Sequence, residues 1–143
     1  MNGVTLPTET VFVMEMSPIK FGLGATDEIG FDAARLGLRK ALIFTDRNLA
    51  AAGLPDRGRA LLEEQGVKED AAEYARTKEF DGLVAVGGGS TIDTCKAANL
   101  LTCHPAPLLD YLNKPVGRGV AVPGPLRPLI AVPTTAGTGS ETT

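Results

Sequence analysis

Residues 83–93 read LVAVGGGSTID, and this stretch decides the fold. Its four consecutive apolar residues predict a strand covered on both faces, and the pattern from Ser90 to Leu101 predicts a helix. The three glycines between them let backbone N–H groups approach an anion, and the helix directs its positive end to the same place. A phosphate or pyrophosphate fits such a turn. Glycines there also serve close packing of strand on helix, so the motif alone leaves both interpretations open.

Strands and helices alternate on both sides of this stretch. We expect Thr26 to be the N-cap of the first helix and Gly37 to end it. The buried face of that helix should hold Ile29, Ala33 and Leu36. The alternation requires crossover connections, which predicts an α/β fold with a mostly parallel, Rossmann-like sheet, flanking helices and ligands beyond the carboxyl ends of the strands. Strands are predicted at residues 41–45 and 129–132, an edge strand or hairpin at 11–14, and helices at 26–36, 55–65, 68–76 and 108–112.

The composition describes one globular domain of 143 residues, 43% hydrophobic and 22% charged. The formal net charge is -3 and the basic residues are scattered, so nucleic acid is not an expected partner. No apolar run approaches the roughly 20 residues of a membrane helix, and Met1 is not followed by a secretory signal pattern. We therefore expect a cytoplasmic protein without a membrane partner. Cys95 and Cys103 have no second pair and are expected to be reduced thiols.

Polar residues follow two of the predicted strands at the edge where a ligand is expected. Asp46 comes directly after the first, where its carboxylate would accept hydrogen bonds from ribose hydroxyls or cap the next helix. After the last strand, PTTAGTGSE at residues 133–141 predicts a second glycine-rich turn. Its hydroxyls suit phosphate and ribose but are also ordinary turn residues. These hydroxyls belong to Thr134, Thr135, Thr138 and Ser140.

The helix after the first glycine turn carries further candidates. Ser90 and Asp93 have the spacing of a capping box, and Lys96 is expected to pair with Asp93 at the surface. Cys95 is expected in the core, because no catalytic partner has a definable relation to it. His104, the sole histidine, is expected to be a solvated loop residue. The spacing departs from G-x-G-x-x-G and no Gly-Lys-Ser/Thr follows, which argues against a phosphate-transferring P-loop enzyme.

Two long motifs together resemble the iron-containing alcohol dehydrogenase family. They are VGGGSTIDTCKA at residues 86–97 and PLIAVPTTAGTGSE at residues 128–141, in the family's order. DYLN at 110–113, the proline-rich stretch after it and ETT at 141–143 resemble the hydroxyacid-oxoacid transhydrogenase branch in particular. The resemblance implies a dehydroquinate synthase-like amino-terminal domain that binds NAD(P), here residues 1–143. In the family a helical domain carrying iron or zinc follows it, with the active site in the cleft between the two.

The resemblance also implies a set of cofactor-binding residues. We assign no catalytic residue. A carboxylate beside the ribose would repel a 2'-phosphate, which favours NAD over NADP. The implied set is Asp46 at the adenosine ribose, Gly87, Gly88, Gly89 and Ser90 at the pyrophosphate, Asp93 near the nicotinamide, and Thr134, Thr135 and Thr138 along the cofactor.

The sequence departs from the family's pattern in two ways. The family's metal ligands, an aspartate and three histidines, follow the second glycine-rich turn, whereas this sequence ends at Thr143 with His104 as its only histidine. We expect neither a metal site nor alcohol dehydrogenase activity from these residues alone. Relatives also place a strand near the adenine between the helix ending at Gly66 and the one containing Tyr74. Only two residues separate those helices here, so either a strand has been lost or residues are missing.

The expected function in the complete protein is hydride transfer between a nicotinamide and a small alcohol, aldehyde or hydroxyacid whose oxygen is polarised by the metal. One alternative is an NAD- and metal-dependent lyase or synthase of dehydroquinate synthase-like architecture, against which the motif at 133–141 argues. The other is a non-catalytic nucleotide-binding fragment. The face that would meet a helical domain should be apolar, so aggregation or association into a homo-oligomer is expected.

Overall fold

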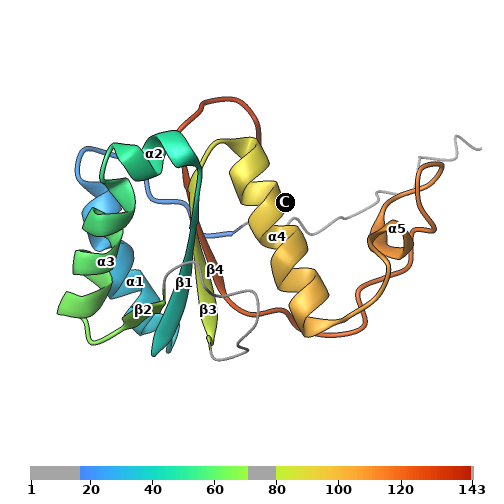
Figure 1. The fold of residues 1–143 in the computed structure, drawn as a ribbon, viewed down its shortest axis with the longest axis horizontal. Helices are drawn as coiled ribbons and strands as arrows, with labels where there is room; N and C mark the ends of the chain where they lie inside the picture. Colours follow the sequence, from blue (N-terminus) through green and yellow to red (C-terminus); the bar gives the residue numbers. More distant parts are fainter. Residues whose placement is uncertain (1–16, 71–79, 143) are drawn as a thin grey trace, which may run out of the picture.

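The computed structural model describes residues 17–70 and 80–142, which form a parallel four-stranded sheet in the order β2-β1-β3-β4 with helices on both faces (Figure 1). This confirms the predicted α/β class. The predicted strand at 11–14 and most of the predicted helix at 68–76 lie outside the described residues. The elements are η1 Ala25–Glu28, α1 Ile29–Arg35, β1 Lys40–Thr45, α2 Arg47–Ala51, α3 Leu54–Glu64, β2 Lys68–Asp70, β3 Gly82–Gly87, α4 Gly89–Cys103, α5 Leu108–Tyr111 and β4 Leu129–Pro133.

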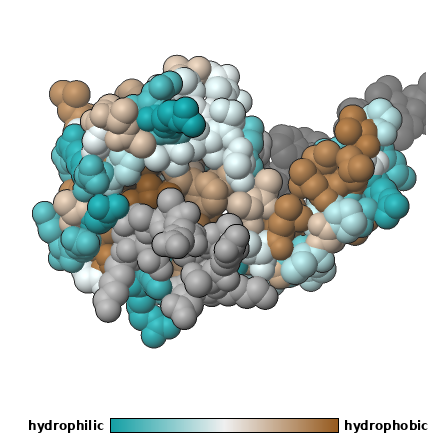
Figure 2. Space-filling view, in the orientation of Figure 1, coloured by the Kyte–Doolittle hydropathy of each residue, from teal (hydrophilic) through white to brown (hydrophobic). Residues whose placement is uncertain are grey.

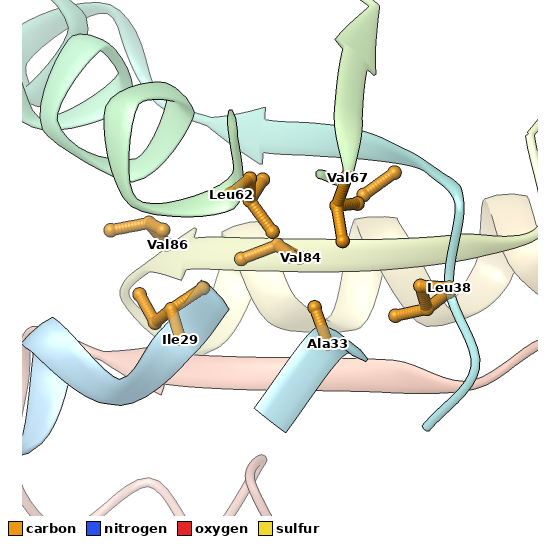
Figure 3. Packing of buried hydrophobic residues seen from close by; sticks show 8 residues of the cluster. Ile29, Ala33, Leu38, Leu62, Val67, Val84 and Val86 are labelled. Carbon is orange, nitrogen blue, oxygen red and sulfur yellow. The ribbon is translucent and has the colours of Figure 1, made fainter. Parts of the chain in front are cut away.

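Strand β3 forms the centre of the structure and is buried along its whole length. It lies between β1 and β4, and its side chains alternate between two apolar clusters. Val84 and Val86 pack against the α1 and α3 side, where Leu62 and Ala33 are fully buried (Figure 3). A strand covered on both faces explains the continuous apolar run that predicted it.

Helix α4 covers the opposite face of the sheet (Figure 1). Leu83, Ala85, Ile92 and Cys95 meet there, each with no exposed surface. The prediction that Cys95 belongs to the core is confirmed. Burial among apolar side chains disfavours the thiolate and raises the pKa of Cys95 to about 12.

The first helix differs from its prediction at both ends. It begins as the 3₁₀ turn η1, whose N-cap is Gly24 with a φ of 81°, so Thr26 is not the cap. Leu36 is 48% exposed because the chain reverses at Gly37, with a φ of 77°. That reversal places Leu38 in the core, and its N–H donates to the carbonyl of Ala33 over 3.0 Å. Gly37 does end the helix, as predicted.

Residues 68–70 form strand β2, not the start of the predicted helix. They pair in parallel with residues 40–42 of β1, and hydrogen bonds to that otherwise open sheet edge outweigh local helix preference. A strand is therefore present where the sequence left open whether a strand had been lost or residues were missing. It is short, and among the described residues Ile43 to Thr45 have no strand on that side.

The predicted helix at 108–112 is present as α5, inside a lobe formed by residues 105–126 that projects from the sheet (Figure 1). The lobe has its own framework: the Arg118 N–H donates to the Leu109 carbonyl over 2.9 Å, and Arg118 pairs with Asp110. A side chain at Gly117 would lie 2.4 Å from two backbone carbonyl oxygens. Apolar residues nevertheless gather on its surface (Figure 2). Its exposed large apolar residues are Leu108, Leu109, Leu112, Val116, Val120, Val122 and Leu126.

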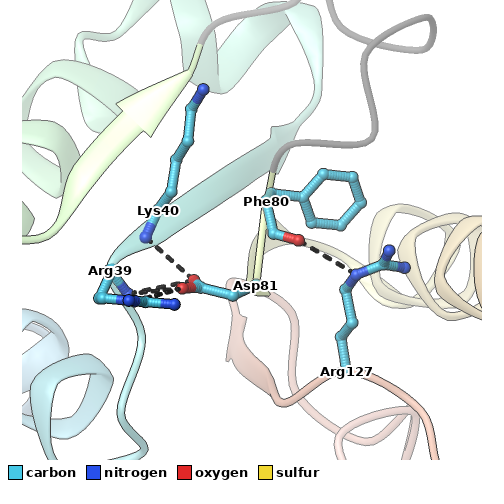
Figure 4. A network of polar contacts seen from close by, with 5 residues as sticks. All are labelled: Arg39, Lys40, Phe80, Asp81 and Arg127. Atoms are coloured by element: carbon cyan, nitrogen blue, oxygen red, sulfur yellow. Dashed lines mark hydrogen bonds and ion pairs between the residues drawn. The ribbon is translucent and has the colours of Figure 1, made fainter.

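Polar contacts tie together the amino-terminal ends of β1 and β3 and the chain entering β4 (Figure 4). The Asp81 carboxylate accepts hydrogen bonds from the backbone N–H groups of Arg39 and Lys40. Arg127 donates from Nε to the Phe80 carbonyl over 3.1 Å, and its guanidinium lies 4.6 Å from the centre of the Phe80 ring. These contacts hold the strands together at the end of the sheet opposite their carboxyl ends.

The predicted strand at 129–132 is β4, whose first four residues are half-buried and whose last, Pro133, is exposed. Among the described strands it pairs with β3 alone, so it forms an edge of the sheet.

None of the described helices is long and apolar enough to cross a membrane.

Candidate functional site

The carboxyl ends of three strands meet at one edge because the strands are parallel, with Thr45 beside Val86 and Val86 beside Val132. An open groove of about 550 Å³ lies there. Five predicted site residues line it: Asp46, Gly88, Ser90, Thr134 and Thr135. Four others do not: Gly87, Gly89, Asp93 and Thr138. The groove is also lined by four residues that were not among the predicted site residues: Arg47, Asn48, Leu49 and Thr91. Their positions directly after Asp46 and Ser90 in the sequence could have identified them.

Asp46 caps helix α2. Its Oδ1 accepts hydrogen bonds from the N–H groups of Asn48 and Leu49, over 2.9 and 3.0 Å. This is the helix-cap role that the sequence left open beside ribose binding. Within the described ranges, Oδ2 of Asp46 has no hydrogen-bond partner, although the residue lines the groove. One carboxylate oxygen is therefore committed to the fold and the other is available to a ligand.

The three glycines of the first turn have different roles. None has a positive φ, and Gly88 is extended, with φ and ψ of -74° and 179°. A Cβ on Gly87 would lie 2.6 Å from the Cβ of Thr91, and one on Gly89 would lie 3.0 Å from Ser140 Oγ. Close packing thus explains Gly87 and Gly89. A Cβ on Gly88 would make an ordinary contact with Thr135 at 3.4 Å, so this glycine is the one that leaves space in the groove.

The start of α4 retains donors for an anion. Its first internal hydrogen bonds run from the Thr91 and Ile92 N–H groups to the Gly88 carbonyl, over 3.0 and 3.1 Å. In residues 17–70 and 80–142, no partner accepts a hydrogen bond from the N–H of Gly88, Gly89 or Ser90. Ser90 is exposed, so the turn is not sealed beneath other segments. These amides and the dipole of a 15-residue helix suit a negatively charged group.

The second glycine-rich turn faces two ways. Thr134 and Thr135 line the groove, and the Thr134 N–H donates to the Gly87 carbonyl over 3.0 Å. Gly137 and Gly139 have φ values of 87° and 68°, which a residue with a side chain adopts at a cost. Beyond them Ser140 is buried against α4.

The predicted capping box is wrong. Helix α4 begins at Gly89 with Gly88 as N-cap and without a side-chain cap, which places Ser90 inside the first turn. Asp93 instead accepts a hydrogen bond from Ser140 Oγ over 3.4 Å, and Lys96 donates from Nζ to the Ser140 carbonyl. Lys96 is half-buried, so its role goes beyond the predicted surface ion pair.

The described residues hold no group of three or more histidine, cysteine, aspartate or glutamate side chains able to bind a metal ion. His104 is half-buried in the chain after α4, and its Nε2 lies 3.2 Å from the Pro125 carbonyl oxygen. It is thus less solvated than predicted. Both cysteines are free thiols, as predicted.

Comparison with known proteins identifies relatives of this chain. A sequence model described as "Iron-containing alcohol dehydrogenase" matches residues 68–143. The mitochondrial hydroxyacid-oxoacid transhydrogenase of Xenopus tropicalis is 47% identical over 154 residues, covering 95% of this chain and 33% of the relative. The Rattus norvegicus protein of the same name is 44% identical over 153 residues, with the same coverage. The chain spans about a third of the length of these relatives.

Solved structures share the fold. An alcohol dehydrogenase from Oenococcus oeni has a TM-score of 0.79 and 30% identity, over 93% of this chain and 38% of that one. A sulfoacetaldehyde reductase from Bifidobacterium kashiwanohense, in complex with NAD+, has a TM-score of 0.76 and 29% identity, over 94% and 39%. The lyase or synthase alternative is not favoured by these matches.

The expected cytoplasmic location is wrong on this comparison. The transhydrogenase relatives that match this chain at 44% and 47% identity are mitochondrial proteins. Composition and the lack of a secretory pattern gave no information on this point.

Proposed function

The chain belongs to the iron-containing alcohol dehydrogenase family, and from that premise we propose that residues 1–143 form the NAD-binding amino-terminal part of an oxidoreductase. One observation carries the proposal: the amides at the start of α4 and Oδ2 of Asp46, which have no hydrogen-bond partner within the described residues, share an open groove. A dinucleotide presents a diphosphate and ribose hydroxyls, which are the groups that such donors and acceptors bind.

Each part of the groove has a role in this proposal. The N–H groups of Gly88, Gly89 and Ser90 hold the diphosphate, and Asp46 Oδ2 accepts from the adenosine ribose. Thr134 and Thr135 line the same groove and offer hydroxyls to the cofactor. Family resemblance adds Asp93 and Thr138 toward the nicotinamide. Asp46 favours NAD over NADP, because its carboxylate repels a 2'-phosphate.

The names of the curated relatives suggest the substrate class. We propose that the complete protein transfers a hydride from a hydroxyacid to an oxoacid. A bound nicotinamide would supply the hydride-transfer chemistry: the hydroxyacid would lose a hydride from its hydroxyl-bearing carbon together with the O–H proton, and the acceptor oxoacid would gain a hydride and a proton. The described residues bind and orient the cofactor. They hold no group of three or more histidine, cysteine, aspartate or glutamate side chains that could bind a metal ion.

Two further expectations belong to this proposal. A polypeptide of residues 1–143 alone does not oxidise alcohols or hydroxyacids, since its described residues supply no set of metal ligands. The complete protein resides in mitochondria, which fractionation of cells expressing it from its own gene would test.

Titration of the purified chain with NADH, followed by nicotinamide fluorescence, tests the proposal. Saturable binding is expected. Replacing Arg47, which lines the groove, with Ala should weaken binding about threefold at low salt through the lost attraction to the diphosphate. Arg39 is the matched control because it precedes β1 at the opposite end of the sheet, and R39A should bind normally. Absence of saturable binding to the wild-type chain would refute the proposal.

A further inference from the structure

We infer that Asp93 and Lys96 of α4 act with Thr138 as a clamp on Ser140, and that this Ser140 clamp positions the second glycine-rich turn for dinucleotide binding. The inference rests on the proposed function. It assigns a positioning role to Lys96 and Ser140, neither of which lines the groove.

Ser140 uses its hydroxyl, carbonyl and amide together. Its Oγ donates to Asp93 Oδ2 over 3.4 Å, and its carbonyl accepts from Lys96 Nζ. Its N–H donates to Thr138 Oγ1 over 3.4 Å. Ser140 is 9% exposed, whereas Asp93 and Thr138 are exposed residues, so these bonds are partly shielded from water. Asp93 and Lys96 are three residues apart and so lie on one side of α4, which lets a single helix face hold Ser140 from two directions.

Gly89 permits this contact. A Cβ at Gly89 would lie 3.0 Å from Ser140 Oγ and 3.1 Å from Thr138 Cβ, so the absence of a side chain brings the turn directly against the first turn of α4. The same first turn carries the amides proposed to hold the diphosphate. The clamp therefore fixes the distal end of the second turn relative to the anion-binding end of the helix.

The second turn needs an anchor at each end. It leaves the sheet at Thr134, whose N–H is bonded to the Gly87 carbonyl. Gly137 and Gly139 lie between that bond and Ser140, and both have left-handed backbone angles. Because glycine has no side chain, the segment between the two anchors would have wide conformational freedom if Ser140 were not held. Thr134 and Thr135 line the groove within this segment. Fixing both ends before the ligand arrives removes an ordering cost from binding.

Two variants test the clamp. Ser140→Ala removes the bond to Asp93, and Lys96→Met removes the donor to the Ser140 carbonyl while keeping an unbranched chain of similar length. The matched controls are Thr94→Ala, whose hydroxyl donates to Ser90 within α4, and Lys114→Met on the lobe. For each variant we would measure the Kd for NADH, the Kd for AMP and the melting temperature.

We expect each clamp variant to weaken NADH binding about tenfold, the effect of losing one hydrogen bond of ordinary strength. AMP binding should change less than twofold, because AMP lacks the second phosphate and the nicotinamide half of the dinucleotide and so makes fewer contacts with the second turn. The control variants should have the same Kd values for NADH and for AMP as the wild-type chain. A loss of affinity for NADH but not for AMP distinguishes positioning of the turn from general destabilisation, which would weaken the binding of both ligands.

Three outcomes would overturn the inference. The clamp alone is refuted if the wild-type chain binds NADH and both variants bind it within twofold. It is also refuted by parallel losses of NADH and AMP affinity. Failure of the wild-type chain to bind NADH refutes the proposed function and the clamp's role with it, and this is recognised before any variant is made.

Discussion

Adjacent glycines of the first turn should respond in opposite ways to the same added methyl group. Gly87→Ala would place a Cβ 2.6 Å from Thr91 Cβ and Oγ1, atoms that α4 holds against β3 and that cannot rotate away. Overpacking of this kind costs about 2 kcal/mol of the free energy of unfolding, and for a chain of this size about 6 °C in melting temperature. Gly88→Ala would meet Thr135 at 3.4 Å, an ordinary contact, so the fold should tolerate it.

Nucleotide affinity should show the reverse order. The methyl of Gly88→Ala enters the groove beside the free amides, so we expect NADH to bind about tenfold more weakly, roughly the loss of one hydrogen bond to the diphosphate. The Kd of Gly87→Ala for NADH, measured below the melting temperature of the variant, should stay within about threefold of that of the wild-type chain.

Thermal unfolding followed by circular dichroism measures the melting temperature, and fluorescence titration measures the Kd for NADH. The assignment of packing to Gly87 and of ligand approach to Gly88 is wrong if Gly87→Ala melts within 1 °C of the wild-type chain, because a clash of this kind should lower the melting temperature by several degrees. It fails equally if Gly88→Ala is the less stable variant.

The remaining predictions concern a carboxylate, a thiol and the lobe. Asp46→Asn should keep the α2 cap, since Asn caps as well as Asp, but lose discrimination against NADP, measured as the ratio of Kd values for NADPH and NADH. Burial raises the pKa of the Cys95 thiol from 9.0 to about 12. The contribution of this buried neutral thiol to the free energy of unfolding should therefore be present below pH 9 and lost as pH rises toward 12. Urea unfolding across that range measures the decline, and a decline equally steep in Cys95→Ala would contradict the prediction. Replacing Leu109 and Val116 with Ser should reduce self-association in light scattering, because both expose apolar surface; unchanged association would place the contact elsewhere.

Much of the sheet followed from apolar runs. The predicted strand at 41–45 is β1, and that at 83–86 is β3, because a central strand of a parallel sheet is buried on both faces and leaves a continuous pattern. β2 could not be predicted this way. Its residues Lys68, Glu69 and Asp70 are polar, and they become a strand through pairing with a distant segment.

The candidate site shows the same limit. Sequence spacing placed Asp46 and Ser90 at strand ends, and both line the groove. The sequence could not show that Gly87 and Gly89 serve close packing, because their packing partners are Thr91 and Ser140, and the contact to Ser140 joins segments far apart in the chain. The wrong capping box has the same origin, because Ser140 holds Asp93 where a local pattern assigned it to the helix start.

The two oxygens of Asp46 connect the fold to the choice of cofactor. Oδ1 holds the start of α2, so the carboxylate cannot rotate toward a ligand without releasing the Asn48 and Leu49 amides. The direction of Oδ2 is thereby set before any nucleotide binds, and a carboxylate with one committed oxygen loses little further side-chain freedom on accepting a ribose hydroxyl. In this proposal the cap seen in the structure and the selection of NAD are two consequences of one side-chain conformation. A residue that kept the cap but not the charge would separate them, whereas one that lost the cap would remove both.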